Sequence, residues 1–192
     1  MSFTMRTRIL GFTLLELLVV ISIAAILIAL AVPTFSSTVK RIRTQSQARD
    51  VASALSYARS EAASRGRRVT VCHLNGNICD GAWGAGFTVF VDGAAQNTMD
   101  PTDIVLREFQ GVGTNTAKLY HYAALVAVAD SSLSFNGRGE AGESLSFVVC
   151  DRDNDPRLAR AVLVSPVGQV NFAAATIGAV SSDIGGNALI CP

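Results

Sequence analysis

The sequence predicts an α+β protein in which one long amino-terminal helix packs on an antiparallel, β-rich globular head. An almost uncharged apolar run occupies residues 12–32, and an amphipathic helical pattern follows it through residues 36–65. The rest of the chain reads as short strands separated by turn residues. About 125 residues follow the helix, which suffices for one compact domain with its own core and is too few for two.

The apolar run matches a membrane-spanning helix. Only Thr13, Glu16 and Ser22 are polar within residues 12–32. At about 1.5 Å per residue, about 21 residues match a hydrocarbon core of about 30 Å. The run is longer than the apolar core of a cleaved secretory signal, so we expect it to remain in the mature protein. Two arginines precede it and predict a cytoplasmic amino terminus and an exported head.

Glu16 is the single charged residue of this run. An ionised carboxylate at the centre of a bilayer costs roughly 2.5–3.5 kcal/mol on insertion scales, and such residues usually have a specific partner. Glu16 is therefore a candidate functional residue.

The second half of the predicted helix is amphipathic. Pro33 is expected to kink it. An apolar stripe is expected to pack on a sheet while the helix arginines point away, and a helix end is expected near Gly66 because glycine suits a left-handed cap. The stripe comprises Val39, Ile42, Val51, Leu55, Ala58 and Ala62, and the arginines are Arg41, Arg43, Arg49, Arg59 and Arg65.

The head contains seven predicted strands with turn residues between them. Several are apolar on both faces, which predicts a sheet between the helix and a second layer. Three segments, 94–103, 111–118 and 174–187, read as loops. The predicted strands are Arg68–Leu74, Gly86–Val91, Ile104–Phe109, Ser132–Phe135, Leu145–Cys150, Ala159–Ser165 and Val170–Ala173.

The net charge of +1 hides an asymmetry. Residues 36–68 carry eight basic and two acidic side chains, whereas residues 69–192 carry six basic and twelve acidic ones. An acidic head argues against general nucleic-acid binding, because phosphate contacts supply most non-specific affinity. Arg65, Arg67 and Arg68 are weak candidates for contacting an anion, although a solvated helix end is the more ordinary role for such residues.

Four cysteines lie in the exported part, and an even number in an oxidising compartment predicts disulfides. Cys72–Cys79 would close a short loop and Cys150–Cys191 would tie the carboxy terminus to a strand, although four cysteines allow three pairings. Zinc is a rival interpretation in which His73 and His121 complete a site. The spacing of the first two cysteines is not that of a usual zinc knuckle, so we expect no metal there.

The remaining chemistry-bearing residues form no enzyme constellation, and we expect no catalytic residues and no cofactor. Asp151, Asp153 and Asp155 alternate as calcium ligands often do, which makes them a weak calcium candidate. The glycine and the closing glutamate of an EF-hand loop are missing, and a polar turn is the ordinary explanation.

The segment Arg8-Ile9-Leu10-Gly11-Phe12-Thr13-Leu14-Leu15-Glu16 resembles the class III signal of type IV pilins and type II secretion pseudopilins. The resemblance implies that a prepilin peptidase cuts between Gly11 and Phe12 and methylates the new amino terminus of Phe12. It also implies that Glu16 pairs with the terminal amine of a neighbouring subunit during assembly. Spacing agrees, because residues four apart share a helix face and Glu16 would lie beside the amine of Phe12.

The head is similar to the GspH/FimT/FimU group of minor pilins and pseudopilins. The similarity rests on Trp83-Gly84-Ala85-Gly86-Phe87, Phe135-Asn136-Gly137-Arg138-Gly139, the cysteines and the turn Ser165-Pro166-Val167-Gly168. It implies a type IV pilin-like fold. The domains would be a cytoplasmic leader (1–11), a transmembrane or filament-core helix half (12–33), an amphipathic helix half (34–66) and a periplasmic head (67–192).

The family implies a single-pass protein of the bacterial inner membrane, with its head in the periplasm, that later enters a filament. Expected partners are other minor and major pilins through the amino-terminal helix, prepilin peptidase and the inner-membrane assembly platform. The expected function is a minor pilin that enters or primes a type IV pilus for assembly, twitching motility and adhesion. The alternatives are a minor pseudopilin of type II secretion and a DNA-binding minor pilin for natural transformation.

Nucleic acid is not an expected partner. Some FimT-like proteins bind DNA through a Gly-Arg-x-Arg motif near the carboxy terminus. The matching stretch here is Gly168-Gln169-Val170-Asn171, in which both arginines are missing.

Overall fold

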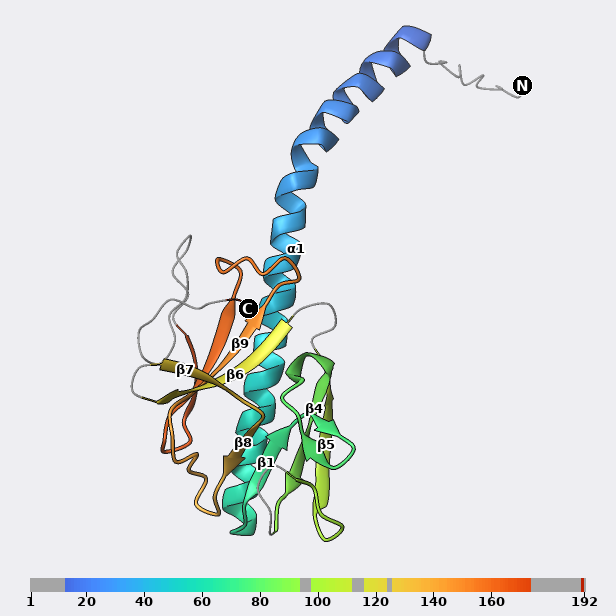
Figure 1. Ribbon diagram of the computed structural model, residues 1–192. Coiled ribbons are helices and arrows are strands. Elements are labelled where there is room, and N and C mark those ends of the chain that lie inside the picture. The colour runs from blue at the N-terminus through green and yellow to red at the C-terminus, as the bar shows by residue number, and fades with distance from the viewer. Residues whose placement is uncertain (1–12, 94–97, 112–115, 124–125, 174–190, 192) are drawn as a thin grey trace, which may run out of the picture. The chain divides into compact units, whose positions relative to one another are not determined.

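A long helix and a β-rich head make up the computed structural model, which describes residues 13–93, 98–111, 116–123, 126–173 and 191 (Figure 1). Helix α1 spans Leu14–Arg65 and continues through Pro33. The chain divides into two compact units, Met1–Val39 and Lys40–Pro192. Among the described residues, no helix combines the length and the apolar character that crossing a membrane requires.

Two antiparallel sheets and a short hairpin form the head. One sheet has the order β5-β4-β1-β8, the other has the order β11-β10-β9-β6-β7, and β2 pairs with β3. The strands are β1 (Val69–Cys72), β2 (Leu74–Asn75), β3 (Ile78–Cys79), β4 (Gly86–Val91), β5 (Ile104–Gln110), β6 (Thr116–Ala123), β7 (Val126–Asp130), β8 (Ser132–Phe135), β9 (Leu145–Cys150), β10 (Arg160–Val164) and β11 (Val170–Phe172), with a 3-10 turn at Trp83–Ala85. The predicted α+β class with an antiparallel head is confirmed.

One face of α1 lies in the main core of the head. Its buried positions recur at intervals of three and four residues, which is the period of a helix face packed on a sheet. Most of these side chains are small, so the helix backbone can approach the strands closely. The buried helix residues are Thr44, Ala48, Val51, Ala52, Ala54, Leu55, Ala58 and Ala62.

Ile42 corrects the predicted apolar stripe. Its side chain is 59% exposed, whereas Thr44 and Ala48 are buried. Val39, also a member of the predicted stripe, is only half-buried, and the buried stripe therefore follows residues 44, 48, 51, 55, 58 and 62. The error arose because apolar character alone selected Ile42, while helix geometry places its side chain away from the line through Val51 and Leu55.

The second sheet has a core on each face. Phe147 and Val149 of β9 belong to the main core, and the alternate residues Val148 and Cys150 belong to a smaller cluster that includes Ala161. Cys191, near the carboxy terminus, packs against this smaller cluster. Every residue of β9 is buried because both faces of this strand are covered.

Strands β6 and β7 correct the sequence analysis. Residues 111–118 were expected to form a loop, but β6 begins at Thr116 and pairs with both β9 and β7. Alanines and polar residues weaken the strand signal in this stretch, and alanine is depleted from strands. Pairing with the central strand β9 supplies the stabilisation that local propensity lacks.

The helix ends in a glycine cap. Gly66 has a φ of 62°, and the Arg67 N–H donates to the Ala62 carbonyl oxygen at 3.3 Å. This is the hydrogen bond of the Schellman motif that spans six residues. In this motif a residue in the left-handed conformation turns the chain so that the next N–H groups bind the last carbonyl oxygens of the helix. The backbone of Gly137 lies against Gly66, since a Cβ on Gly137 would stand 2.5 Å from the Gly66 carbonyl. The loop after β8 is therefore docked on the helix end.

Candidate functional site

Thr13 caps the start of α1. Its Oγ1 accepts a hydrogen bond from the Glu16 N–H at 3.2 Å, and its carbonyl oxygen accepts the Leu17 N–H at 3.2 Å. A threonine before the helix satisfies amide groups that have no partner within the first turn. Glu16 lies in that turn, where the positive end of the helix dipole favours a carboxylate. The Thr-x-x-Glu spacing thus both starts the helix and positions the acid.

The surface around Glu16 is apolar on every side of the helix. The exposed large side chains in this stretch are Leu14, Leu15, Leu17, Leu18, Val19, Val20, Ile21, Ile23, Ile26, Leu27 and Ile28. A helix that is apolar all round is normally buried in a protein core or a membrane. Glu16 is itself exposed in the single subunit. This segment therefore presents one carboxylate within an apolar surface that another apolar environment has to cover.

The two processing residues, Gly11 and Phe12, lie outside the described residues. Cleavage and methylation at these positions therefore remain predictions. The structure describes the chain from Thr13 onward, which includes the cap and Glu16.

The three alternating aspartates of the calcium candidate take separate partners. Asp151 is buried and its Oδ1 accepts the Asp155 N–H at 2.7 Å, whereas Asp153 forms an ion pair with Lys40. Asp155 Oδ1 accepts the Arg157 N–H at 3.0 Å. Within the described part of the chain, no group of three or more acidic, histidine or cysteine side chains could hold a metal ion. These carboxylates instead organise the turn between β9 and β10.

The Lys40–Asp153 pair joins the helix to this turn. Its hydrogen bond and charge attraction raise the pKa of Lys40 and lower the pKa of Asp153. Lys40 is also the first residue of the second compact unit. The pair therefore fixes the turn to the beginning of the helical stretch that belongs to the head.

The three arginines at the helix end have different surroundings. Arg65 forms an ion pair with Glu61 at 2.6 Å, one helical turn away. Arg67 lies beside the loop that follows β4, where a Cβ on Gly93 would stand 3.5 Å from its guanidinium and 3.3 Å from Asp103. Arg68 is only partly exposed and continues into β1. Contact of these arginines with an anion therefore stays a prediction.

Disulfide bonds join Cys72 to Cys79 and Cys150 to Cys191. The four sulfur atoms are thus engaged and supply no thiolate for zinc. His73 Nδ1 lies 2.7 Å from Asp80 Oδ1. The Ala82 N–H and then His73 lower the pKa of Asp80. His121 lies in β6.

Arg59 makes contacts that the sequence did not predict. Its side chain was expected to point away from the sheet. Its Nε donates to the Gly139 carbonyl oxygen and its Nη2 to the Val167 carbonyl oxygen, both at 3.1 Å. The backbone of Gly168 also touches Gly139, since a Cβ on Gly168 would stand 1.9 Å from that oxygen. Arg59 therefore holds two loops of the head on the helix.

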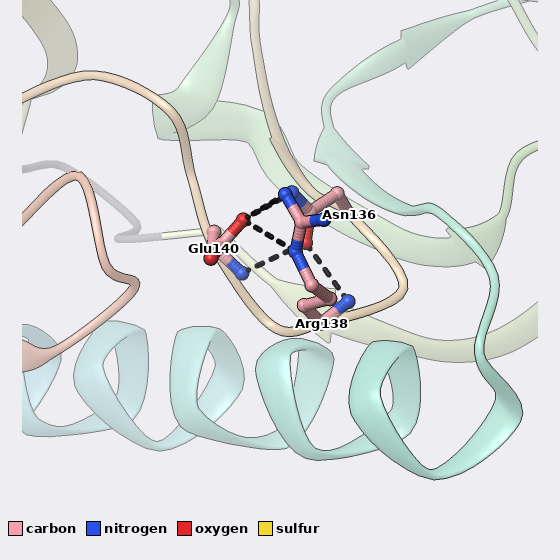
Figure 2. Close-up of polar contacts among 3 residues, drawn as sticks. All are labelled: Asn136, Arg138 and Glu140. Atoms are coloured by element: carbon pink, nitrogen blue, oxygen red, sulfur yellow. Dashed lines mark hydrogen bonds and ion pairs between the residues drawn. The ribbon is translucent and has the colours of Figure 1, made fainter.

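Figure 2 shows the polar cluster that shapes the first of these loops. Asn136 Oδ1 accepts the N–H groups of Arg138 and Glu140 at 2.9 and 3.1 Å, and Asn136 Nδ2 donates to Glu140 Oε2 at 2.8 Å. Arg138 donates to the same oxygen from Nε and Nη2 at 2.9 and 2.8 Å. These bonds lower the pKa of Glu140, with Arg138 as the larger cause. The cluster has the character of a structural turn.

Comparisons with known proteins agree with this arrangement. The model of the family described as "Type II transport protein GspH" matches residues 47–168, and the prokaryotic N-terminal methylation motif matches residues 6–32. No curated protein sequence matches the chain significantly.

Two crystal structures of the type IV minor pilin FimU of Pseudomonas aeruginosa strain PAO1 resemble this fold. One has 24% identity and a TM-score of 0.53, covering 70% of this chain and 91% of FimU. The other has 25% identity and a TM-score of 0.50, covering 68% and 93%. The family and this fold are those of structural pilins and not of enzymes. With its amino-terminal methylation motif and its GspH-type head, the chain belongs to the GspH family and is a minor pilin or pseudopilin of the GspH/FimT/FimU kind.

Proposed function

We propose that this protein is a minor pilin that enters or primes a type IV pilus. In this proposal, prepilin peptidase cuts between Gly11 and Phe12 and methylates Phe12. The protein is first held in the bacterial inner membrane with its head in the periplasm, and the assembly platform then moves it into the filament. Its partners there are other minor and major pilins, which it contacts through the amino-terminal helix.

The capped helix start supports this proposal most directly. The Thr13 cap holds Glu16 in the first turn, surrounded by exposed apolar side chains. When neighbouring helices cover this surface, the carboxylate loses its water, and an uncompensated buried charge is strongly unfavourable. The methylated amine of a neighbouring Phe12 supplies the opposite charge. Pairing of Glu16 with this amine then selects one axial register, because any other register leaves both charges unpaired.

A Glu16→Ala variant tests the proposal. We expect the head to fold as in the wild type, because Glu16 lies outside the compact unit that holds the core. We also expect incorporation into pili to be lost, as measured by immunoblotting of sheared filaments and by twitching motility. Glu143→Ala, which removes an exposed carboxylate of the head, is the matched control and should leave piliation unchanged. Normal piliation and normal incorporation of Glu16→Ala would contradict the proposal.

A role in type II secretion is the second candidate, and the match to the family of type II transport protein GspH favours it. In that role, deletion of the protein would abolish secretion of exoproteins and leave twitching motility intact. The pilus proposal expects the reverse. A role in DNA uptake has less support, because Gln169 and Asn171 stand where the arginines of the DNA-binding motif would lie.

A further inference from the structure

One side of α1 carries unpaired positive charge alongside the second sheet. Arg41 and Arg49 are eight residues apart, which places them on the same side of the helix at 3.6 residues per turn. Both are exposed, and among the described residues no ion pair reaches either of them. Arg59 follows farther along this side, and Arg160 of β10 lies close enough to Arg41 for their charges to repel. We call these four residues the cationic strip.

The cationic strip continues into a groove between the helix and β11. This groove has a volume of about 380 Å³ and is lined by Ser56, Arg59, Ser60, Ala63, Arg138, Gln169 and Val170. Arg138, which lines the groove, forms an ion pair with Glu140. The groove therefore combines hydroxyl and amide groups with the net positive charge of Arg59.

Strand β11 borders this groove as the edge of its sheet. It pairs with β10 on one side, and no described strand pairs with its other side. Phe172 on β11 and Val167 in the preceding turn are 54% and 62% exposed. A free strand edge offers backbone donors and acceptors at the spacing of another strand, which is the geometry of β-strand addition. An added strand would also cover these two apolar side chains.

We propose that the cationic strip and the edge of β11 together dock an acidic, extended segment of a neighbouring pilin subunit. This inference rests on the proposed function, because it requires a neighbouring subunit. The segment adds a strand to β11 while its carboxylates meet the guanidinium groups of Arg41 and Arg49. The head of this protein itself has the charge that such a segment needs, since residues 69–192 carry twelve acidic and six basic side chains. A strip on the helix of one subunit that meets the head of the next is a heterologous contact, which propagates into a filament and does not close.

A protein strand fits this surface better than a nucleic acid. The exposed polar positions on β11 and just before it, Asn171 and Gln169, are neutral amides, so phosphates would meet no cation along the strand. The open backbone edge matches a peptide and not a sugar-phosphate chain. The burial of Arg160 and its proximity to Arg41 lower the pKa of Arg160, which indicates mutual repulsion that carboxylates would relieve.

Site-specific photocrosslinking tests the inference in full-length protein assembled in cells. A photoreactive residue replaces Asn171, and a second version replaces Glu108 on the opposite sheet's edge strand β5 as a position control. We expect the Asn171 position to form an adduct with another pilin, identified by mass spectrometry. The combined Arg41→Glu and Arg49→Glu changes should lower its yield roughly tenfold, because charge complementarity becomes repulsion.

Arg43→Glu is the matched control for these changes. Arg43 is also exposed, but two residues after Arg41 it lies on the other side of the helix, so its reversal should leave the adduct unchanged. Equal yields in the double variant and the wild type would overturn the inference, as would an adduct with nucleic acid or no adduct at Asn171 in filaments that incorporate the protein. Absence of the wild-type protein from filaments would instead refute the proposed function itself.

Discussion

The two stretches of α1 differ in what they bury. From Leu14 to Ile28, the large leucine, isoleucine and valine side chains are exposed in the single subunit. From Thr44 to Ala62, the buried positions are mostly alanine, with Val51 and Leu55 as the larger members. Alanine-rich packing lets strands lie close to a helix, whereas bulky exposed side chains have to be covered by other molecules or lipid. The difference shows that one helix serves two environments, one within the subunit and one outside it.

The strongest test of this comparison exchanges one leucine for alanine in each stretch. Leu55 is 1% exposed and Leu18 is 54% exposed. Leu55→Ala should lower the free energy of unfolding of the head by about 2–5 kcal/mol, because it leaves a cavity in a packed core. Leu18→Ala should change it by no more than about 0.5 kcal/mol. Urea unfolding of both full-length variants in detergent, followed by tryptophan fluorescence of the buried Trp83, measures the two effects. Equal destabilisation would remove the distinction between the stretches.

A second test addresses how the head loops are held on the helix. Gly168 and Gly142 have similar positive φ values, 78° and 82°. A Cβ on Gly168 would stand 1.9 Å from the Gly139 carbonyl oxygen, whereas a Cβ on Gly142 would have no described neighbour within 4 Å. Both alanine variants incur backbone strain of about 1–3 kcal/mol. Gly168→Ala should lower the free energy of unfolding by roughly a further 1–3 kcal/mol, because the new Cβ displaces the backbone of Gly139.

Thermal unfolding of the two glycine variants measures this difference. A lower melting temperature is expected for both, with the larger decrease for Gly168→Ala. If the two variants melt at the same temperature, the close approach of the loops makes no contribution and Arg59 alone holds them.

The smallest effect concerns the ion pair at the start of the head unit. Lys40 lowers the pKa of Asp153 below its ordinary value of 3.8, and Asp80 and Glu140 also have lowered pKa values. A carboxyl group with a lowered pKa in the folded state stabilises it above the unfolded-state pKa, and this contribution is lost as the pH falls through the folded-state value. The head should therefore lose stability on acidification below about pH 4.

Asp153→Asn measures how much the Lys40–Asp153 pair contributes to this pH-dependent stability. Between about pH 5 and about pH 3, the melting temperature of this variant should fall less than that of the wild type. The reason is that one of the three carboxyl groups with a lowered pKa is absent. High salt should reduce the difference, since the pair is half exposed and therefore screened. Coincident melting curves at each pH would show that the contact to the helix does not stabilise the head.

Much of the fold follows from sequence pattern. The predicted strands Gly86–Val91, Ser132–Phe135 and Leu145–Cys150 coincide with β4, β8 and β9, because β-branched and aromatic residues cluster there between turn residues. The start of β6 escaped prediction because Thr116, Ala117 and Lys118 follow a run of glycine, threonine and asparagine that reads as a loop, although the tyrosines and valines farther along β6 and β7 favour strands. Strand β6 pairs with β9, a partner that is distant in the chain, and among the described strands β7 pairs only with β6, so the place of both strands in the sheet depends on β9.

The sequence by itself determined the amino-terminal arrangement. Thr13 and Glu16 lie three residues apart within an apolar run, and helix geometry converts this spacing into a capped first turn that carries a carboxylate. Tertiary structure alone decided the fate of the helix arginines. Arg59 holds two loops of the head, whereas Arg41 lies near Arg160 of β10 and has no ion pair among the described residues. Local sequence could not predict the contacts of Arg59, because the two carbonyl oxygens that it binds belong to residues 80 and 108 positions away in the chain.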